Sequence, residues 1–279
     1  MIKKIHYCWL GGKPLPSSVR SCLKSWKRFC PDYEIVRWDE SSFPINQYPW
    51  VKEAIKQRLY AFAADFIRLK VLYEYGGVYM DVDIELIKPI DGYLTSSFVS
   101  GFTNHHIHTD EMNYVSEDGY NMLTGKRYRW FQVQAGFMYS EPHHPFIEHC
   151  LSALYENGQR AFYRSDGSCN IFTMDIMLIR MLEKYGIRYV DETQHLELGI
   201  TIYKSNIFAT RRSLDRESVL IHWFDQSWRR GGGWKMKAKK IIKSRFYWLY
   251  RTANRFYSRV ASFFVSHSAK PSKIANLNR

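Results

Sequence analysis

Two aspartates, Asp81 and Asp83, lie within a run of alternating apolar residues at positions 78–86. Alternation predicts a strand whose side chains point to opposite faces. In a strand the two aspartates stand roughly 6.6–6.8 Å apart on one face. Two carboxylates at that distance repel by roughly 2.4 kcal/mol at an effective dielectric of about 20. The predicted polar face consists of Tyr79, Asp81, Asp83 and Glu85.

Either water screens this pair of carboxylates or a cation lies between them. Hard oxygen ligands suit Mg²⁺ or Mn²⁺, which commonly bind one or two carboxylates together with the phosphates of a substrate. A solvated strand face is the alternative for so short a motif. The sequence therefore indicates a candidate divalent-cation site and leaves the solvated face open.

A second pair of charges, Asp65 and Arg68, lies in the segment that precedes the aspartates. Residues 60–69 are apolar on nearly every side, which is typical of a helix buried on most faces. Asp65 and Arg68 are three residues apart and share one face of that helix. Because a buried charge needs a partner, they form either a structural ion pair or the lining of a polar ligand site.

The elements that must position these residues alternate between strand and helix. Gly76 suits the end of the helix that carries Asp65, because glycine accepts a positive φ. Residues 103–130 are polar and show no periodicity, which indicates an insertion or a loop. Alternating elements predict a mixed α/β sheet with helices on both faces. We expect strands at 2–9, 33–38, 78–86, 134–139, 200–203 and 219–223, and helices at 17–30, 51–75 or 59–75, 145–155 and 171–185.

Composition excludes several classes of protein. The chain has 279 residues, of which 46% are hydrophobic, so global disorder is excluded. It contains no run of 18 apolar residues and no evident signal peptide, so we expect neither a spanning helix nor secretion. Five cysteines without metal-ligand spacing argue against a disulfide framework. We therefore expect a protein of the cytoplasm.

The formal net charge of +13 is concentrated at the C-terminus. Residues 226–279 hold 14 Lys or Arg and no acid, which leaves 26 bases against 27 acids in residues 1–225. Apolar residues from Ile242 to Phe264 recur at spacings of four and three, and three glycines at 231–233 suggest a linker. We expect a domain at 1–228 and a basic amphipathic helical tail at 229–279.

A basic amphipathic helix with aromatic residues at its margins is typical of segments that lie on anionic membranes. We therefore predict that residues 235–265 contact an anionic membrane surface. Three alternatives remain: the tail docks on the body, forms a dimer contact, or binds single-stranded nucleic acid. The nearly neutral body argues against the last of these, so we expect no nucleic-acid partner.

The segment 60–86 resembles the core of the glycosyltransferases of family 32, which carry a sugar-binding region with a DXD motif, and is similar to the glucosylating bacterial toxins. Residues 5–12 resemble the family's opening strand. Residues 221–228 resemble its closing element. The resemblance covers residues 1–228 and implies a GT-A fold, which is a Rossmann-like α/β domain for a nucleotide sugar and a divalent metal.

The resemblance also implies roles for particular residues. Trp9 would stack on the nucleobase, Asp65 and Arg68 would hold hydroxyls of the donor sugar, and Asp81 would contact ribose and sugar. Asp83 would bind Mn²⁺ or Mg²⁺ together with Asp81 and His222, with Asp225 or Ser227 competing for the place of His222. Ser227 and Trp228 would bind the pyrophosphate of the donor.

The resemblance implies a metal-dependent enzyme that transfers a hexose from a nucleotide sugar and retains the configuration of the sugar. We expect UDP as the nucleotide. The acceptor would be a glycan, lipid-linked in the setting of capsule, O-antigen or other surface polysaccharide synthesis. The tail would place the enzyme at the inner face of the cell membrane. Two segments depart from the family pattern and leave the substrate open: Gln134-Ala135-Gly136 and residues 171–175.

The main alternative enzyme is a Mg²⁺-dependent phosphohydrolase, with Asp81 as nucleophile and Asp83 as acid. Such aspartyl-phosphate enzymes usually carry the motif near the first strand and follow it with a small hydroxyl residue. Here Ile84 follows Asp83, and the motif lies about 80 residues into the chain. A basic nucleic-acid-binding protein is the third class, suggested by net charge alone.

Overall fold

The computed structural model describes residues 1–104, 114–126, 131–156 and 174–224. The predicted basic tail, its segment 235–265 and the expected ligands Asp225, Ser227 and Trp228 lie outside these residues. Among the described helices, none combines the length and the apolar character that crossing a bilayer requires.

The first half of the chain follows the predicted order of elements. Helix α1 buries Val19, Cys22 and Trp26, which recur at helical spacing, and leaves its polar side exposed. The expected long helix is divided in two by residues 57–59. The elements of this half are β1 (Lys4–Cys8), α1 (Ser17–Phe29), β2 (Glu34–Trp38), α2 (Pro49–Lys56), α3 (Tyr60–Tyr75) and β3 (Gly77–Met80).

The second half differs more from prediction. Of the segment expected as a strand at 134–139, only residues 137–139 lie in a strand, β7, and strands β5, β6, β8 and β10 were not predicted. Strand β5 has no clear strand pattern. Two of its seven positions are Ser100 and Gly101, which weaken a strand pattern. The elements are β4 (Ile84–Leu86), β5 (Phe98–Asn104), β6 (Phe131–Val133), β7 (Phe137–Ser140), α4 (Pro145–Glu156), α6 (Met174–Leu182), β8 (Gln194–Leu196), β9 (Ile200–Tyr203), β10 (Phe208–Thr210) and β11 (Leu220–His222).

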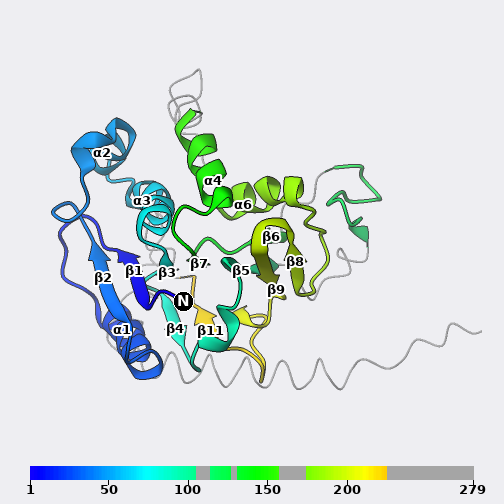
Figure 1. Cartoon of the computed structure of the whole chain (residues 1–279), viewed down its shortest axis with the longest axis horizontal. Coiled ribbons are helices and arrows are strands. Elements are labelled where there is room, and N and C mark those ends of the chain that lie inside the picture. Colours follow the sequence, from blue (N-terminus) through cyan, green and yellow to red (C-terminus); the bar gives the residue numbers. More distant parts are fainter. Residues whose placement is uncertain (105–113, 127–130, 157–173, 225–279) are drawn as a thin grey trace, which may run out of the picture.

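These strands form two sheets (Figure 1). The larger has the order β2-β1-β3-β7-β5-β9-β8, and β6 pairs with β5. Strand β1 pairs in parallel with β2 and β3, whereas β7 runs antiparallel to β3 and β5. The smaller sheet has the order β10-β11-β4. The expectation of a mixed α/β fold is confirmed.

The prediction of one continuous strand at 78–86 is wrong. Strand β3 belongs to the larger sheet and β4 to the smaller one, and a turn from Asp81 to Ile84 joins them. The Ile84 amide donates to the Asp81 carbonyl across 2.9 Å, as in a β-turn. The turn breaks the alternation, so Glu85 does not share a face with the two aspartates. It is buried, and its carboxylate accepts a hydrogen bond from Trp223 Nε1 at 3.1 Å.

A glycine is required where α3 meets β3. Gly76 has φ +61°, which is unfavourable for other residues. A Cβ at this position would lie 2.7 Å from Ile2 Cδ1 and 2.8 Å from Pro142 Cδ. Gly76 ends the helix as predicted and has a positive φ, but its ψ of −167° lies outside the left-handed helical region of a typical C-cap. The close approach of Ile2 and Pro142 is a second reason for glycine.

Candidate functional site

The charged residues meet where the order of strands in the larger sheet reverses. Strands β1 and β3 are parallel neighbours: the connection through α1 runs from β1 to β2 on one side, and the connection through α2 and α3 runs from β2 back past β1 to β3 on the other. In open α/β sheets, ligands bind outside the carboxyl ends of strands at such a point. Trp9 follows the carboxyl end of β1, and Asp81 follows that of β3.

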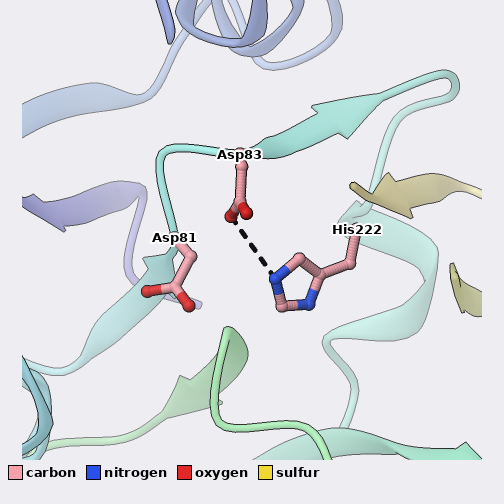
Figure 2. Close-up of side chains that lie close together, drawn as sticks. All are labelled: Asp81, Asp83 and His222. Atoms are coloured by element: carbon pink, nitrogen blue, oxygen red, sulfur yellow. Dashed lines mark ion pairs between the residues drawn. The ribbon is translucent and has the colours of Figure 1, made fainter. Parts of the chain in front are cut away.

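A group of three potential metal ligands lies at this place (Figure 2). Asp81 comes from the end of β3, Asp83 from the turn and His222 from β11. One ligand atom from each residue lies within 4.8 Å of the others. Strand β11 pairs with β4 so that His222 lies opposite Ile84, and this pairing brings residues 140 positions apart together. Sequence analysis predicted all three residues, and the structure brings them together.

The electrostatics of His222 fit a cation ligand. Its Nε2 faces Asp83 Oδ1 at 3.3 Å, and its side chain is 7% exposed. Burial lowers its pKa, but Asp83, and then Asp81 and Asp175, raise the pKa above its ordinary value. The carboxylates therefore favour a positive charge at this place, which a proton on His222 can supply and which a divalent cation would supply instead. Its Nδ1 is buried without a hydrogen-bond partner among the residues that the structure describes.

Gly136 forms the wall of this cluster opposite the turn. A Cβ at position 136 would lie 2.7 Å from His222 Cε1 and 3.0 Å from Asp81 Oδ2. The Gly136 carbonyl accepts a hydrogen bond from the Asp81 amide at 2.8 Å. Glycine therefore fixes the backbone at Asp81 and leaves room for the imidazole and the carboxylate.

Arg68 connects α3 to the cluster. Its Nη2 lies 3.0 Å from Asp65 Oδ1 and 3.4 Å from Asp81 Oδ1, and its Nη1 donates to the Ala135 carbonyl at 2.7 Å. The guanidinium side chain is 7% exposed, so it is a buried positive charge shared by two carboxylates. Of the two alternatives for Asp65 and Arg68, the structure shows the ion pair, which lies at the edge of the metal-ligand cluster. The lining of a ligand site stays a prediction.

Two carboxyl groups near Arg68, those of Asp65 and Asp175, have raised pKa values. Burial raises the pKa of Asp65 to about 7, although Arg68 works in the opposite direction. Burial also raises the pKa of Asp175, whose carboxylate accepts a hydrogen bond from the Ala135 amide at 2.7 Å. Perturbed carboxyl groups of this kind are common at functional sites. Among the described residues, the site thus contains Asp65, Asp81, Asp83 and Asp175 near Arg68.

Asp175 and Tyr79 are the site residues that sequence reasoning missed. Segments 134–136 and 171–175 depart from the pattern of the family, which marked them as sites where the substrate could be determined. The sequence assigned no role to Asp175 itself. Tyr79 was placed on a polar face, yet it is 1% exposed and donates from its hydroxyl to Asp81 Oδ1 at 3.1 Å. It therefore positions Asp81 from within the core.

Trp9 is half-buried at the end of β1. Its backbone amide donates to the Trp38 carbonyl at 2.9 Å, and its indole Nε1 donates to the Lys13 carbonyl at 2.6 Å. These hydrogen bonds fix the Trp9 ring at the carboxyl end of β1, where the order of strands in the sheet reverses. The position suits the predicted stacking on a nucleobase, which stays a prediction.

Residues 16–99 match the protein family described as "Glycosyltransferase sugar-binding region containing DXD motif". The matched region runs from α1 through β4 and includes Asp65, Arg68, Asp81 and Asp83. The resemblance of residues 60–86 to the glycosyltransferases with a DXD motif is thereby confirmed for this part of the chain.

Several relatives of this region are named as mannosyltransferases. Inositol phosphoceramide mannosyltransferase 3 of Schizosaccharomyces pombe is 33% identical over 96 residues, which cover 33% of this chain and 27% of that protein. The initiation-specific alpha-1,6-mannosyltransferase of Saccharomyces cerevisiae is 38% identical over 102 residues, or 33% of this chain and 21% of that protein. The chain therefore spans only about a quarter of the length of these relatives.

Solved structures with a partial likeness also include glycosyltransferases. The galactosyltransferase LgtC, solved with donor and acceptor sugar analogues, has a TM-score of 0.43 at 11% identity and covers 86% of this chain and 94% of its own. The PaToxG glycosyltransferase has a TM-score of 0.44 at 16% identity, with coverage of 66% and 69%.

Proposed function

We propose that this chain is a metal-dependent glycosyltransferase of GT-A type that moves a hexose from a nucleotide sugar to a glycan acceptor. The observation that carries the proposal is the cluster of Asp81, Asp83 and His222 at the switch point of the sheet. The family match of residues 16–99 supports the same class.

Asp81, Asp83 and His222 would hold a divalent cation, Mn²⁺ or Mg²⁺. Two carboxylates and one imidazole are a donor set that both ions accept, and carboxylate oxygens are their preferred ligands. When bound, such an ion stabilises negative charge on the pyrophosphate leaving group. Tyr79 and the Gly136 carbonyl hold Asp81 in place for this role.

Asp65 and Arg68 would bind hydroxyls of the donor sugar, and Trp9 would stack on the nucleobase. Arg68 is held rigidly by three acceptors, so it offers fixed positive charge close to the place where the leaving group would develop negative charge. Transfer with retention needs no strong general base in the protein, and we assign none. Ser227 and Trp228 are our expected ligands of the pyrophosphate.

The donor is proposed to be a nucleoside diphosphate hexose. UDP is the expected nucleotide, whereas the names of the relatives favour mannose as the sugar. Three relatives are named as inositol phosphoceramide mannosyltransferases, which favours a lipid-borne acceptor. We therefore propose synthesis of a surface glycan on a lipid-linked acceptor, such as capsule or O-antigen, at the inner face of the cell membrane.

The test is hydrolysis of a panel of UDP- and GDP-hexoses by the purified chain with and without Mn²⁺. Asp83→Asn removes one negative ligand and should abolish the metal-dependent turnover. Glu85→Gln is the matched control, because Glu85 lies two residues away and its carboxylate faces Trp223 instead of the cluster. It should keep the turnover of the wild type.

Equal activity of Asp83→Asn and the wild type would refute the cation site. Absence of turnover with every nucleotide sugar would count against the proposed reaction. Thermal shift with the same panel gives a second readout, because a bound donor stabilises the fold in proportion to the logarithm of its concentration over its dissociation constant.

A further inference from the structure

The charge of the body is itself unevenly distributed along the chain. Residues 1–31 contain seven bases and no acid, which leaves 19 bases against 27 acids in residues 32–225. A body with nearly no net charge therefore consists of a basic N-terminal part and an acidic remainder. Four of the seven bases belong to one helix, α1.

These four residues form what we call the basic face of α1: Arg20, Lys24, Lys27 and Arg28. Their spacing of four, three and one places them on one side of the helix. All four side chains are exposed, and none forms an ion pair with a described residue. Lys3 and Lys4, by contrast, pair with Asp32 and Glu34. Figure 1 shows α1 at the margin of the molecule, beside β4 and β11.

A hollow of about 530 Å³ lies between α1 and the smaller sheet. Lys24 and Arg28 of the basic face line it, together with apolar side chains from Phe29, Leu86 and Ile221. It therefore combines positive charge with an apolar floor. Such a combination suits a molecule that carries both a phosphate and a hydrocarbon part.

Two acids also line the hollow, but both carboxylates are engaged by the protein. Glu85 accepts a hydrogen bond from Trp223 Nε1 at 3.1 Å. Asp215 accepts one from the Glu217 amide at 2.8 Å and another from Asn206 Nδ2 at 2.6 Å. Neither acid pairs with Lys24 or Arg28 in the described chain, so the two bases keep their charge for a partner.

The hollow lies on the other side of the smaller sheet from the metal-ligand cluster. Ile221 and His222 are successive residues of β11, and successive strand residues point to opposite faces. Ile221 lines the hollow, and His222 faces Asp83. If α1 binds a surface, the metal-ligand cluster therefore stays uncovered and lies close to that surface.

We propose that the basic face of α1 docks the body on an anionic phospholipid surface. The proposal rests on the proposed function, because a lipid-linked acceptor would lie in that surface. The 14 bases of residues 226–279 follow β11 in the sequence and carry further positive charge. The body thus contributes a membrane contact of its own beside that predicted for the tail.

A lipid surface fits this face better than a nucleic acid does. Proteins that bind single strands stack bases on exposed aromatic rings. On α1 the ring of Trp26 is fully buried, and Phe29 is half-buried beneath the guanidinium of Arg28, 5.2 Å from its ring centroid. The face therefore offers charge and an apolar hollow, but no stacking platform.

The experiment measures co-sedimentation of the full chain with phosphatidylcholine vesicles that contain or lack phosphatidylglycerol. The test variant combines Lys24→Gln, Lys27→Gln and Arg28→Gln. The control combines Lys52→Gln, Lys56→Gln and Arg58→Gln on and just after α2, which removes the same charge elsewhere. Each base near an anionic surface contributes about fivefold in partition. We expect the test variant to lose at least about tenfold and the control less than about twofold.

Several outcomes would overturn the docking surface. Equal losses in the two variants would mean that only net charge matters, and unchanged binding of the test variant would remove α1 from the contact. Loss of affinity for a single-stranded oligonucleotide with unchanged vesicle binding would assign the face to nucleic acid. Circular dichroism checks that both variants fold. Hydrolysis of the nucleotide sugar in solution separates the two proposals, because it tests the proposed reaction and should be the same in both variants.

Discussion

At Gly136, the space that a side chain would occupy belongs to the metal-ligand cluster. A methyl group there would lie 2.7 Å from His222 Cε1 and 3.0 Å from Asp81 Oδ2, closer than carbon atoms pack. The imidazole and the carboxylate would both have to move. The role of Gly136 is therefore to let two ligands approach each other from separate sheets.

We expect Gly136→Ala to lower the affinity for Mn²⁺ by about tenfold or more, because misplaced ligands lose coordination. Titration followed by calorimetry or by thermal shift measures it. Gly92→Ala is the matched control, since no atom lies within 4 Å of a Cβ built at that glycine. Equal Mn²⁺ affinity of Gly136→Ala and the wild type would show that the cluster does not hold the ion.

Trp9 gives a second prediction at this scale. If its ring stacks on the nucleobase, Trp9→Ala should weaken nucleotide binding by roughly 1–3 kcal/mol. Isothermal titration with the free nucleoside diphosphate measures the change. Trp9→Phe keeps an aromatic face and should restore part of the affinity. A nucleotide affinity that does not respond to Trp9→Ala would remove this residue from the site.

Single residues of the site could be predicted when a local motif marked them. Asp81 and Asp83 stand in a strand-like run, and their type and spacing indicated a cation site. His222 was implied only by the resemblance of residues 221–228 to the closing element of a known family. Asp175 could not be predicted, because its contact with the Ala135 amide joins residues 40 positions apart. No local pattern reports such a contact before the fold is known.

At the scale of elements, His6 of β1 forms hydrogen bonds with residues of β2 and of the end of α3. Its Nε2 lies 2.9 Å from the carbonyl of Gly76 at the end of α3, and its Nδ1 accepts a hydrogen bond from Trp38 Nε1 of β2 at 3.1 Å. Because Nδ1 is an acceptor, Nε2 carries the proton, and the imidazole is neutral. Burial lowers the pKa of His6 to about 4.

The lowered pKa of His6 predicts a pH dependence of stability. Below the unfolded value of about 6.5 the unfolded chain binds a proton that the fold does not, so the free energy of unfolding falls as the pH drops from about 6.5 to 4. The pKa difference corresponds to a loss of about 3 kcal/mol. Urea unfolding across this range measures it.

His6→Gln should be less stable at neutral pH and should show a flatter profile, because the proton-binding group is gone. The difference between the two profiles isolates His6 from the carboxyl groups of the site. His195→Gln on the exposed side of β8 is the control and should keep the slope of the wild type. A wild-type profile that is parallel to that of His6→Gln would contradict the prediction.

Most elements could be predicted because each helix and strand has a period in its own sequence. The strand at 78–86 could not, since its alternation continues through the turn at Asp81–Asp83 while the chain passes from one sheet to the other. The position of the break depends on which strands pair with each other, and β4 pairs with β11, about 135 residues later. Local alternation contains no information on such a partner.

At the scale of the molecule, the predicted boundary near residue 228 separates a described body from a segment with 14 bases. We predict that a chain ending at residue 230 hydrolyses the nucleotide sugar as the full chain does but binds anionic vesicles at least about tenfold less, since each base contributes about 1 kcal/mol near such a surface. Co-sedimentation measures the binding. Equal vesicle binding by the two chains would exclude the tail as the anchor.

The pairing of β11 with β4 has a consequence for the newly made protein. Both carboxylates are synthesised within the first third of the chain, but the imidazole that completes the cluster is at position 222. A nascent chain that has emerged only as far as β9 contains the aspartates and Arg68 and lacks their closing strand. The ribosome therefore has to release nearly the whole body before the three proposed ligands can come together, and a chain terminated before β11 lacks one of them.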